Sequence, residues 1–164
     1  MEQSKTKRLA LYGVMAALAL ILSFVESRVP PLFAFPGMKL GLTNIVVVAA
    51  LYLYGNKSAY LINAVRIIIS ALLFGTGVSL LYSIGGGMLS VTVMVALRRI
   101  KKLHVVSVSV AGAIAHNVGQ ILVAMLLLNT TKAFWYFLLL WISGVVSGAI
   151  IGLLGAVLLK RIKK

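Results

Sequence analysis

Arg66 is the residue whose chemistry stands out, because it lies in the middle of a long apolar segment. If that segment crosses a membrane, an arginine near the midplane costs on the order of 3 kcal/mol, so it must face a partner, a cavity or the interior. Apart from Glu2, the chain's one acidic residue is Glu26. Arg66 therefore either pairs with Glu26, as a structural or gating contact, or awaits an anionic ligand. The planar guanidinium suits a carboxylate or a phosphate.

A second polar group consists of His116, Asn117 and Gln120, again inside an apolar segment. His116 and Gln120 are four residues apart and share a helix face, and Asn117 is next to them. Buried amides and an imidazole are costly unless they are satisfied. A single histidine would be a core residue, whereas this cluster favours contact with a ligand. The only other histidine is His104 and there is no cysteine, so we predict no metal site.

Two glycine-containing stretches complete the candidate site. In residues 36–45, Lys39 and Asn44 lie about one turn apart, which predicts the rim of a site. Ser83 precedes three glycines, of which Gly86 is the central one. These glycines either expose backbone N–H groups to an anion or permit a tight helix crossing. Together the candidates predict one outward-open, cationic pocket for an anionic small molecule, lined by Lys39, Asn44, Arg66, Ser83, Gly86, His116, Asn117 and Gln120.

The composition requires a lipid environment around the elements that carry these residues. Of the 164 residues 62% are hydrophobic and 11% are charged, and the mean hydropathy is +1.10. A soluble domain is typically about half apolar, with about a quarter of its residues charged. The net charge of +14 does not indicate nucleic-acid binding, because the basic residues form short clusters between apolar runs. We therefore predict one all-α integral membrane domain over residues 1–164.

Six transmembrane helices are expected, with both termini cytoplasmic. The predicted spans are residues 9–25, 40–54, 59–74, 78–97, 105–128 and 134–159. The outer loop 26–39 contains all three prolines of the chain, which favour extended or turn backbone. This loop is either a lid over the helices or a re-entrant segment. From these spans we expect a multi-pass protein of the bacterial cell membrane.

The distribution of basic residues sets the orientation. In this topology three lie outside, Arg28, Lys39 and Lys132, and Arg66 lies within the membrane. The other twelve are inside: Lys5, Lys7, Arg8, Lys57, Arg98, Arg99, Lys101, Lys102, Lys160, Arg161, Lys163 and Lys164. Cytoplasmic loops carry an excess of lysine and arginine. The stretch 36–45 is therefore predicted to face outward.

The motifs resemble the Gx transporter family, whose members are often labelled heptaprenyl diphosphate synthase component I. The resemblance covers essentially the whole chain and is carried by residues 36–44, Arg66, residues 83–87 and residues 112–120. That family is similar to the S components of energy-coupling factor (ECF) transporters. The resemblance implies an S-component-like bundle of six helices that binds a vitamin, an isoprenoid or a quinone precursor from outside.

The same resemblance implies the partners of an ECF-type ABC importer. These are a transmembrane coupling subunit and two ATPase subunits, which use the ATP; no cofactor is expected in this chain. A small-residue motif on the first helix of S components contacts the coupling subunit, and Ala10, Gly13 and Ala17 would play that part. From the residues alone, Gly13 and Ala17 equally suit internal helix packing.

The synthase label is tested by the acidic residues. Prenyl diphosphate synthesis needs aspartates that hold Mg²⁺ against the diphosphate, and this chain has no aspartate and two glutamates. We therefore expect no enzyme activity in this chain. The alternative function is a non-catalytic accessory subunit linked to prenyl diphosphate or quinone synthesis.

Overall fold

The computed structural model describes residues 5–28, 41–129 and 137–162. Within these ranges the chain forms six helices and no strand. The helices are α1 (Lys5–Arg28), α2 (Asn44–Tyr54), α3 (Asn56–Phe74), α4 (Gly77–Arg98), α5 (Val105–Leu128) and α6 (Phe137–Ile162). The all-α prediction is confirmed. Five of the helices, all except α2, are long and apolar enough to cross a membrane, so the chain is a multi-pass membrane protein.

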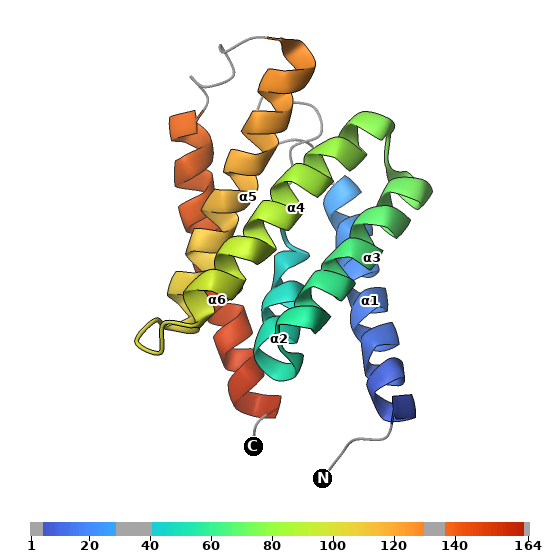
Figure 1. Cartoon of the computed structure of the whole chain (residues 1–164), viewed down its shortest axis with the longest axis vertical. Helices are drawn as coiled ribbons and strands as arrows, with labels where there is room; N and C mark the ends of the chain where they lie inside the picture. The colour runs from blue at the N-terminus through green and yellow to red at the C-terminus, as the bar shows by residue number, and fades with distance from the viewer. Residues whose placement is uncertain (1–4, 29–40, 130–136, 163–164) are drawn as a thin grey trace.

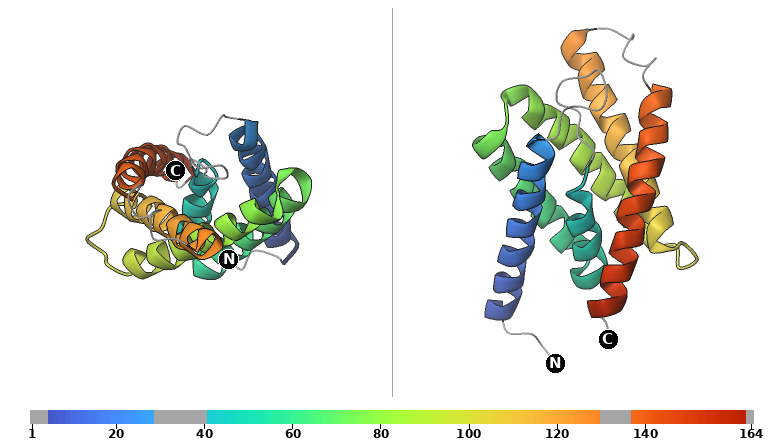
Figure 2. Two further views of the ribbon diagram at one scale, coloured as in Figure 1. Left: turned by 90° about the horizontal axis from the view of Figure 1, so that it is seen from above. Right: turned by 180° about the vertical axis from the view of Figure 1, so that it is seen from behind.

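The short helix α2 lies inside the bundle, between α1 on one side and α6 on the other (Figures 1 and 2). It packs chiefly against α3 and α6, and seven of its eleven residues are buried. At a rise of about 1.5 Å per residue, eleven residues reach only about half of the hydrocarbon layer. The start of α1 and the end of α6 lie at the same end of the bundle (Figure 1).

Short connections separate α2 from α3 and α3 from α4. Gly55 alone joins α2 to α3, and its positive φ of 92° suits glycine. At the start of α4, Thr76 and Ser79 form a reciprocal capping box, which satisfies two of the free N–H groups of the first turn. Asn129 ends α5 in the left-handed conformation, as an asparagine readily does.

Some helix bounds differ from the prediction. α1 continues to Arg28, so Glu26 belongs to a helix and not to the predicted loop 26–39. Residues 29–40 of that loop, including Lys39 and the three prolines, lie outside the described residues. α6 continues to Ile162, so Lys160 and Arg161 belong to its last turn. The predicted span 40–54 contains a helix only from Asn44 onward.

Glycines set the closest helix crossings. On α6, Gly144, Gly148 and Gly152 form a stripe with a spacing of four residues. A Cβ at Gly148 or at Gly152 would stand 2.7 Å from a Cα atom of α5, so neither position has room for a side chain. Where α4 meets α5, a Cβ at Gly119 would lie 2.4 Å from the carbonyl oxygen of Gly85. Small residues that let helix backbones touch are typical of membrane bundles.

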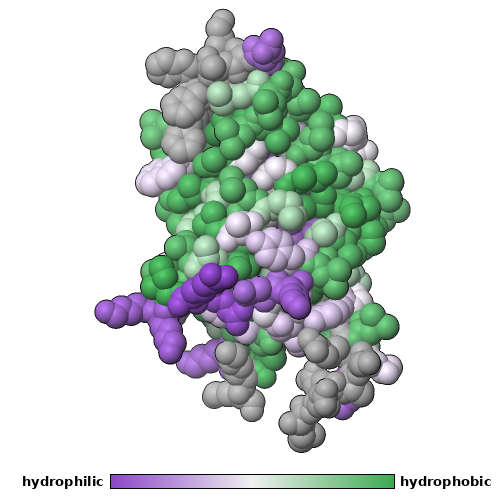
Figure 3. All heavy atoms as spheres, viewed as in Figure 1, coloured by the Kyte–Doolittle hydropathy of each residue, from purple (hydrophilic) through white to green (hydrophobic). Residues whose placement is uncertain are grey.

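The surface agrees with a lipid environment. Large apolar side chains are exposed along α1, α3, α5 and α6, among them Val14, Leu72, Leu126 and Ile150. In Figure 3 the hydrophobic surface covers most of the visible face, and hydrophilic residues gather toward the end where both termini lie. The exposed residues Arg99, Lys101 and Lys102, in the α4–α5 connection, belong to that end.

Candidate functional site

Arg66 lies buried near the middle of α3, where one helix face carries polar residues. Its Nη2 donates a hydrogen bond of 2.8 Å to Oδ1 of Asn63, and only 4% of the Arg66 side chain is exposed. Within the described part of the chain, Nε of Arg66 has no hydrogen-bond partner. Arginine carries five N–H donors, so the guanidinium keeps capacity for an acceptor.

Glu26 of α1 contacts the start of α2. Its Oε1 accepts hydrogen bonds from the backbone N–H groups of Gly41 and Leu42, the latter at 3.4 Å. The Glu26 side chain is 5% exposed and lies within Coulombic reach of Arg66. The two opposite charges therefore attract each other, while the same carboxylate also holds the turn before α2.

Asn44, a predicted rim residue, is the first residue of α2 and is buried. Its backbone N–H donates to the carbonyl oxygen of Gly41 at 2.8 Å, which closes the turn that Glu26 contacts. Gly41 has a φ of +80°, and a Cβ there would lie 2.9 Å from Nδ2 of Asn44. Asn44 and Glu26 therefore meet at the same turn.

A second polar group lies where α4 crosses α5. A Cβ at Gly86 would stand about 3.0 Å from both Cγ of Gln120 and Cε1 of His116, so these three predicted residues are in contact. The amide oxygen of Gln120, which is 1% exposed, has no hydrogen-bond partner among the described residues. Ser83 is buried one turn before Gly86.

The next glycine connects this crossing to α3. A Cβ at Gly87 would lie 3.2 Å from both polar atoms of the Asn63 side chain, the residue that holds Arg66. Polar residues of three helices thus lie close together across α3, α4 and α5. Because α4 is one continuous helix, its glycines do not free backbone N–H groups; the alternative of a tight crossing is the one observed.

Asn117 turns away from this group. Its Nδ2 donates to the carbonyl oxygen of Leu140 at 2.6 Å and to Oγ of Ser143 at 3.4 Å, both on α6. These contacts fasten α5 to α6, so Asn117 has a structural partner that the sequence did not indicate.

Asn63 is the residue that sequence reasoning missed. It is completely buried and orients Arg66. A signal was present, because Asn63, Arg66 and Ser70 follow each other at intervals of three and four residues, the spacing of one helix face. The predicted residue Lys39 lies outside the described residues.

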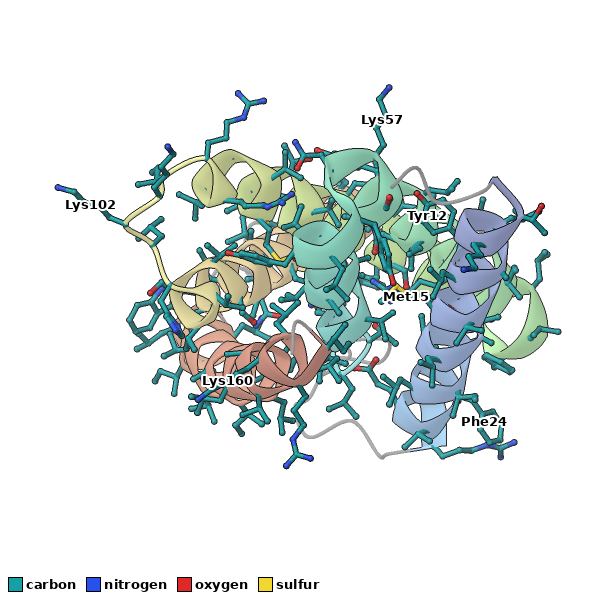
Figure 4. The ribbon with its side chains drawn as sticks, turned by 90° about the horizontal axis from the view of Figure 1, so that it is seen from below. Tyr12, Met15, Phe24, Lys57, Lys102 and Lys160 are labelled. Atoms are coloured by element: carbon teal, nitrogen blue, oxygen red, sulfur yellow. The ribbon has the colours of Figure 1, made fainter. Side chains whose placement is uncertain are left out.

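The small residues of α1 face outward. Ala10, Gly13 and Ala17 are exposed, and a Cβ at Gly13 would meet nothing within 4 Å. Viewed from below in Figure 4, Tyr12 and Met15 are labelled on the side of α1 that faces the bundle, where both pack against buried residues of α2 and α3. In the described structure the small residues therefore do not serve internal packing.

A separate hollow opens near the end where both termini lie. It has a volume of about 250 Å³ and is lined by Asn56, Val95, Arg98 and Arg99. Arg98 donates to Oδ1 of Asn56 at 3.2 Å and stacks over the ring of Tyr52.

The described residues contain no group of three histidine, cysteine or acidic side chains that could hold a metal ion.

Comparison with known proteins identifies a family. A family model described as heptaprenyl diphosphate synthase component I matches residues 15–158, which includes every residue of the polar group. No curated protein and no solved structure matches the chain.

Proposed function

Because the chain belongs to the heptaprenyl diphosphate synthase component I family, we propose that it is a substrate-binding membrane subunit that captures an anionic, partly apolar small molecule. The ligand is a vitamin, an isoprenoid or a quinone precursor that arrives from outside a bacterial cell. The subunit passes it to an ECF-type importer, whose coupling subunit and two ATPases supply the energy.

The observation that carries the proposal is the buried, incompletely hydrogen-bonded guanidinium of Arg66. A cation in the middle of an apolar helix is costly, and its hydrogen-bond acceptor Asn63 is neutral. An anionic group bound beside Arg66 would add negative charge and an acceptor for Nε, with Gln120 and Asn44 as further hydrogen-bonding groups. Apolar residues around them suit the rest of the ligand.

The proposed docking surface for the coupling subunit is the exposed small-residue face of α1. Gly13 and Ala17 are exposed and leave room for a second helix to approach closely, which is how small residues promote helix association in membranes. Substitution of Ala17 by tryptophan should therefore reduce co-purification with the coupling subunit. Substitution of the exposed Ile150 of α6 by tryptophan should not.

A second candidate function follows from the family description, which names component I of a synthase. In this alternative the chain is a membrane accessory subunit that holds a prenyl diphosphate enzyme or its lipid product. The chain has no aspartate for the Mg²⁺ chemistry of that reaction, so catalysis would reside in another subunit.

Retention of small molecules by the purified protein tests the capture proposal. Mass spectrometry should find an anionic compound with the parent protein and with Arg98→Ala, a matched loss of an arginine at the far end of the bundle. Arg66→Ala should retain at least tenfold less, because a buried charged hydrogen bond contributes about 1.5–3 kcal/mol. Equal retention by both variants would remove Arg66 from the site.

Co-purification separates the two functions. Recovery of ATPase and coupling subunits with the tagged chain is expected for the importer. Recovery of a soluble synthase without those subunits would favour the accessory function and contradict the importer.

A further inference from the structure

The carboxylate of Glu26 lies where two separate sources of positive charge meet. Its Oε1 accepts hydrogen bonds from the N–H groups of Gly41 and Leu42, in the turn that leads through Thr43 into α2. A helix N-terminus carries a partial positive charge and favours anions. The first turn of α2 contains no acidic residue of its own, so the carboxylate comes from a different helix.

The second source is Arg66 of α3. Its side chain is 4% exposed and lies within Coulombic reach of Glu26, and its Nε has no partner in the described part of the chain. The surroundings are buried as well, since Thr43 and Asn44 at the start of α2 are almost fully covered. Charge interactions are strong in such a low-dielectric setting.

The groups that donate hydrogen bonds or positive charge and the Glu26 carboxylate that accepts them belong to elements that are packed into the bundle to different extents. Gly41 and Leu42 belong to the turn before α2, most of which is buried, and Arg66 belongs to α3, which packs on α1, α2 and α4. Among its described side chains, α1 buries only Ala19, Ser23 and Glu26, and among the described helices it packs on α3 and α2. The carboxylate is therefore carried by a peripheral helix, which can shift while the rest of the bundle keeps its packing.

We propose that the Glu26 carboxylate occupies the anion position of the binding site, and that a ligand's carboxylate or phosphate group binds by taking its place. The ligand oxygen then accepts from the N–H groups of Gly41 and Leu42, beside Arg66. This inference rests on the proposed capture of an anionic ligand and adds the atoms that hold the anionic end. It also makes Glu26 a resident competitor that excludes weakly binding anions.

Chemical rescue tests this position without knowledge of the natural ligand. Glu26→Ala removes the carboxylate, and formate is the probe that can replace it. In detergent solution, formate should raise the unfolding temperature of Glu26→Ala in a saturable way, relative to chloride at equal ionic strength, and leave the parent unchanged. The double variant Glu26→Ala/Arg66→Ala should need at least tenfold more formate. An equal response of parent and Glu26→Ala would overturn the proposal.

A second variant keeps the test decisive if Glu26→Ala does not fold. Glu26→Gln preserves the size of the side chain but removes its charge, so inorganic phosphate should bind at least tenfold more tightly than to the parent in equilibrium dialysis. Glu2→Gln, which removes the chain's other acidic charge, is the matched control and should behave as the parent does. Unchanged or weaker phosphate binding by Glu26→Gln would contradict competition by Glu26.

The outcomes separate the anion position from the capture function. If formate stabilises Glu26→Ala but no small molecule is retained by the purified parent protein, the proposed anion position is supported and the proposed capture of a metabolite is contradicted. If the parent retains a metabolite and Arg66→Ala does not, but formate fails to stabilise Glu26→Ala, capture is supported and competition by Glu26 is contradicted.

Discussion

Asn63 positions the guanidinium on which the proposed site depends. It accepts a hydrogen bond from Arg66 and lies against Gly87 of α4. Replacement by aspartate should give Arg66 a permanent anionic partner at the same place. We therefore expect Asn63→Asp to fold, with an unfolding temperature no lower than that of the parent, and to retain at least tenfold less anionic compound by mass spectrometry.

The control for this charge effect is Asn63→Ala, which removes the acceptor without adding charge. It leaves a buried donor unsatisfied, at a cost of about 1–3 kcal/mol of stability. If Asn63→Asp retained as much ligand as the parent, Arg66 would not be the anion-binding group.

Gly41 has the most demanding backbone at the start of α2. Its φ is +80°, and a Cβ would press on the Asn44 side chain at 2.9 Å. Gly41→Ala should lower the free energy of unfolding by about 1–2 kcal/mol, because a left-handed conformation costs other residues that much. Gly77→Ala, at a glycine whose Cβ would meet nothing within 4 Å, is the matched control. Equal thermal unfolding of the two variants would contradict this role of Gly41.

At the residue scale, the sequence predicts burial better than it predicts partners. Arg66, His116 and Gln120 are buried as expected, because polar side chains within apolar helices have to face inward. Their partners depend on how each helix is rotated about its axis, which distant packing decides. Asn117 therefore contacts α6, although it is adjacent in sequence to His116.

At the scale of the helices, the glycines of α6 determine how closely α6 can pack against α5. A Cβ at Gly148 would lie 2.7 Å from the Cα of Val110, whereas a Cβ at Gly155 would lie 3.4 Å from a side-chain methyl group of Val48, which is an ordinary van der Waals distance. Gly148→Ala should therefore destabilise the protein by about 1–3 kcal/mol, as overpacking does. Gly155→Ala on the same helix should be near neutral, since alanine is the better helix former.

Thermal unfolding in detergent compares these two variants directly. Their equal stability would mean that the α5–α6 approach tolerates a methyl group, and that the glycine stripe does not set the distance between the helices.

The same elements show the limit of sequence reasoning about length. Apolar runs predicted every helix, because only a helix satisfies its own backbone in lipid. The run 40–54 carried no sign that its helix begins only at Asn44. The turn at Gly41 and its contact with Glu26 of α1 define that start, and a contact between residues fifteen positions apart is not visible in a local pattern.

For the whole molecule, the absence of cysteine from the sequence makes the membrane orientation directly measurable. The α2–α3 and α4–α5 connections lie toward the end that contains the termini (Figure 1). Single cysteines at the exposed positions Lys57 and Lys102, at these two connections, should react with an impermeant maleimide only after the cells are opened. A cysteine at the exposed Gly77, at the opposite end, should react in intact cells. The reverse pattern would invert the orientation predicted from lysine and arginine.

The shortness of α2 has a consequence for how the protein is made. A helix of eleven residues reaches about half of the roughly 30 Å hydrocarbon layer, so it cannot be retained there by its own hydrophobicity. Gly55 joins it directly to α3, and the two must enter the bilayer as a hairpin. Its other main neighbour, α6, is synthesised after α3, α4 and α5. The side of α2 that packs on α6 therefore lacks this neighbour through most of synthesis, and a chain interrupted before residue 137 would expose that side to the quality-control proteases of the membrane.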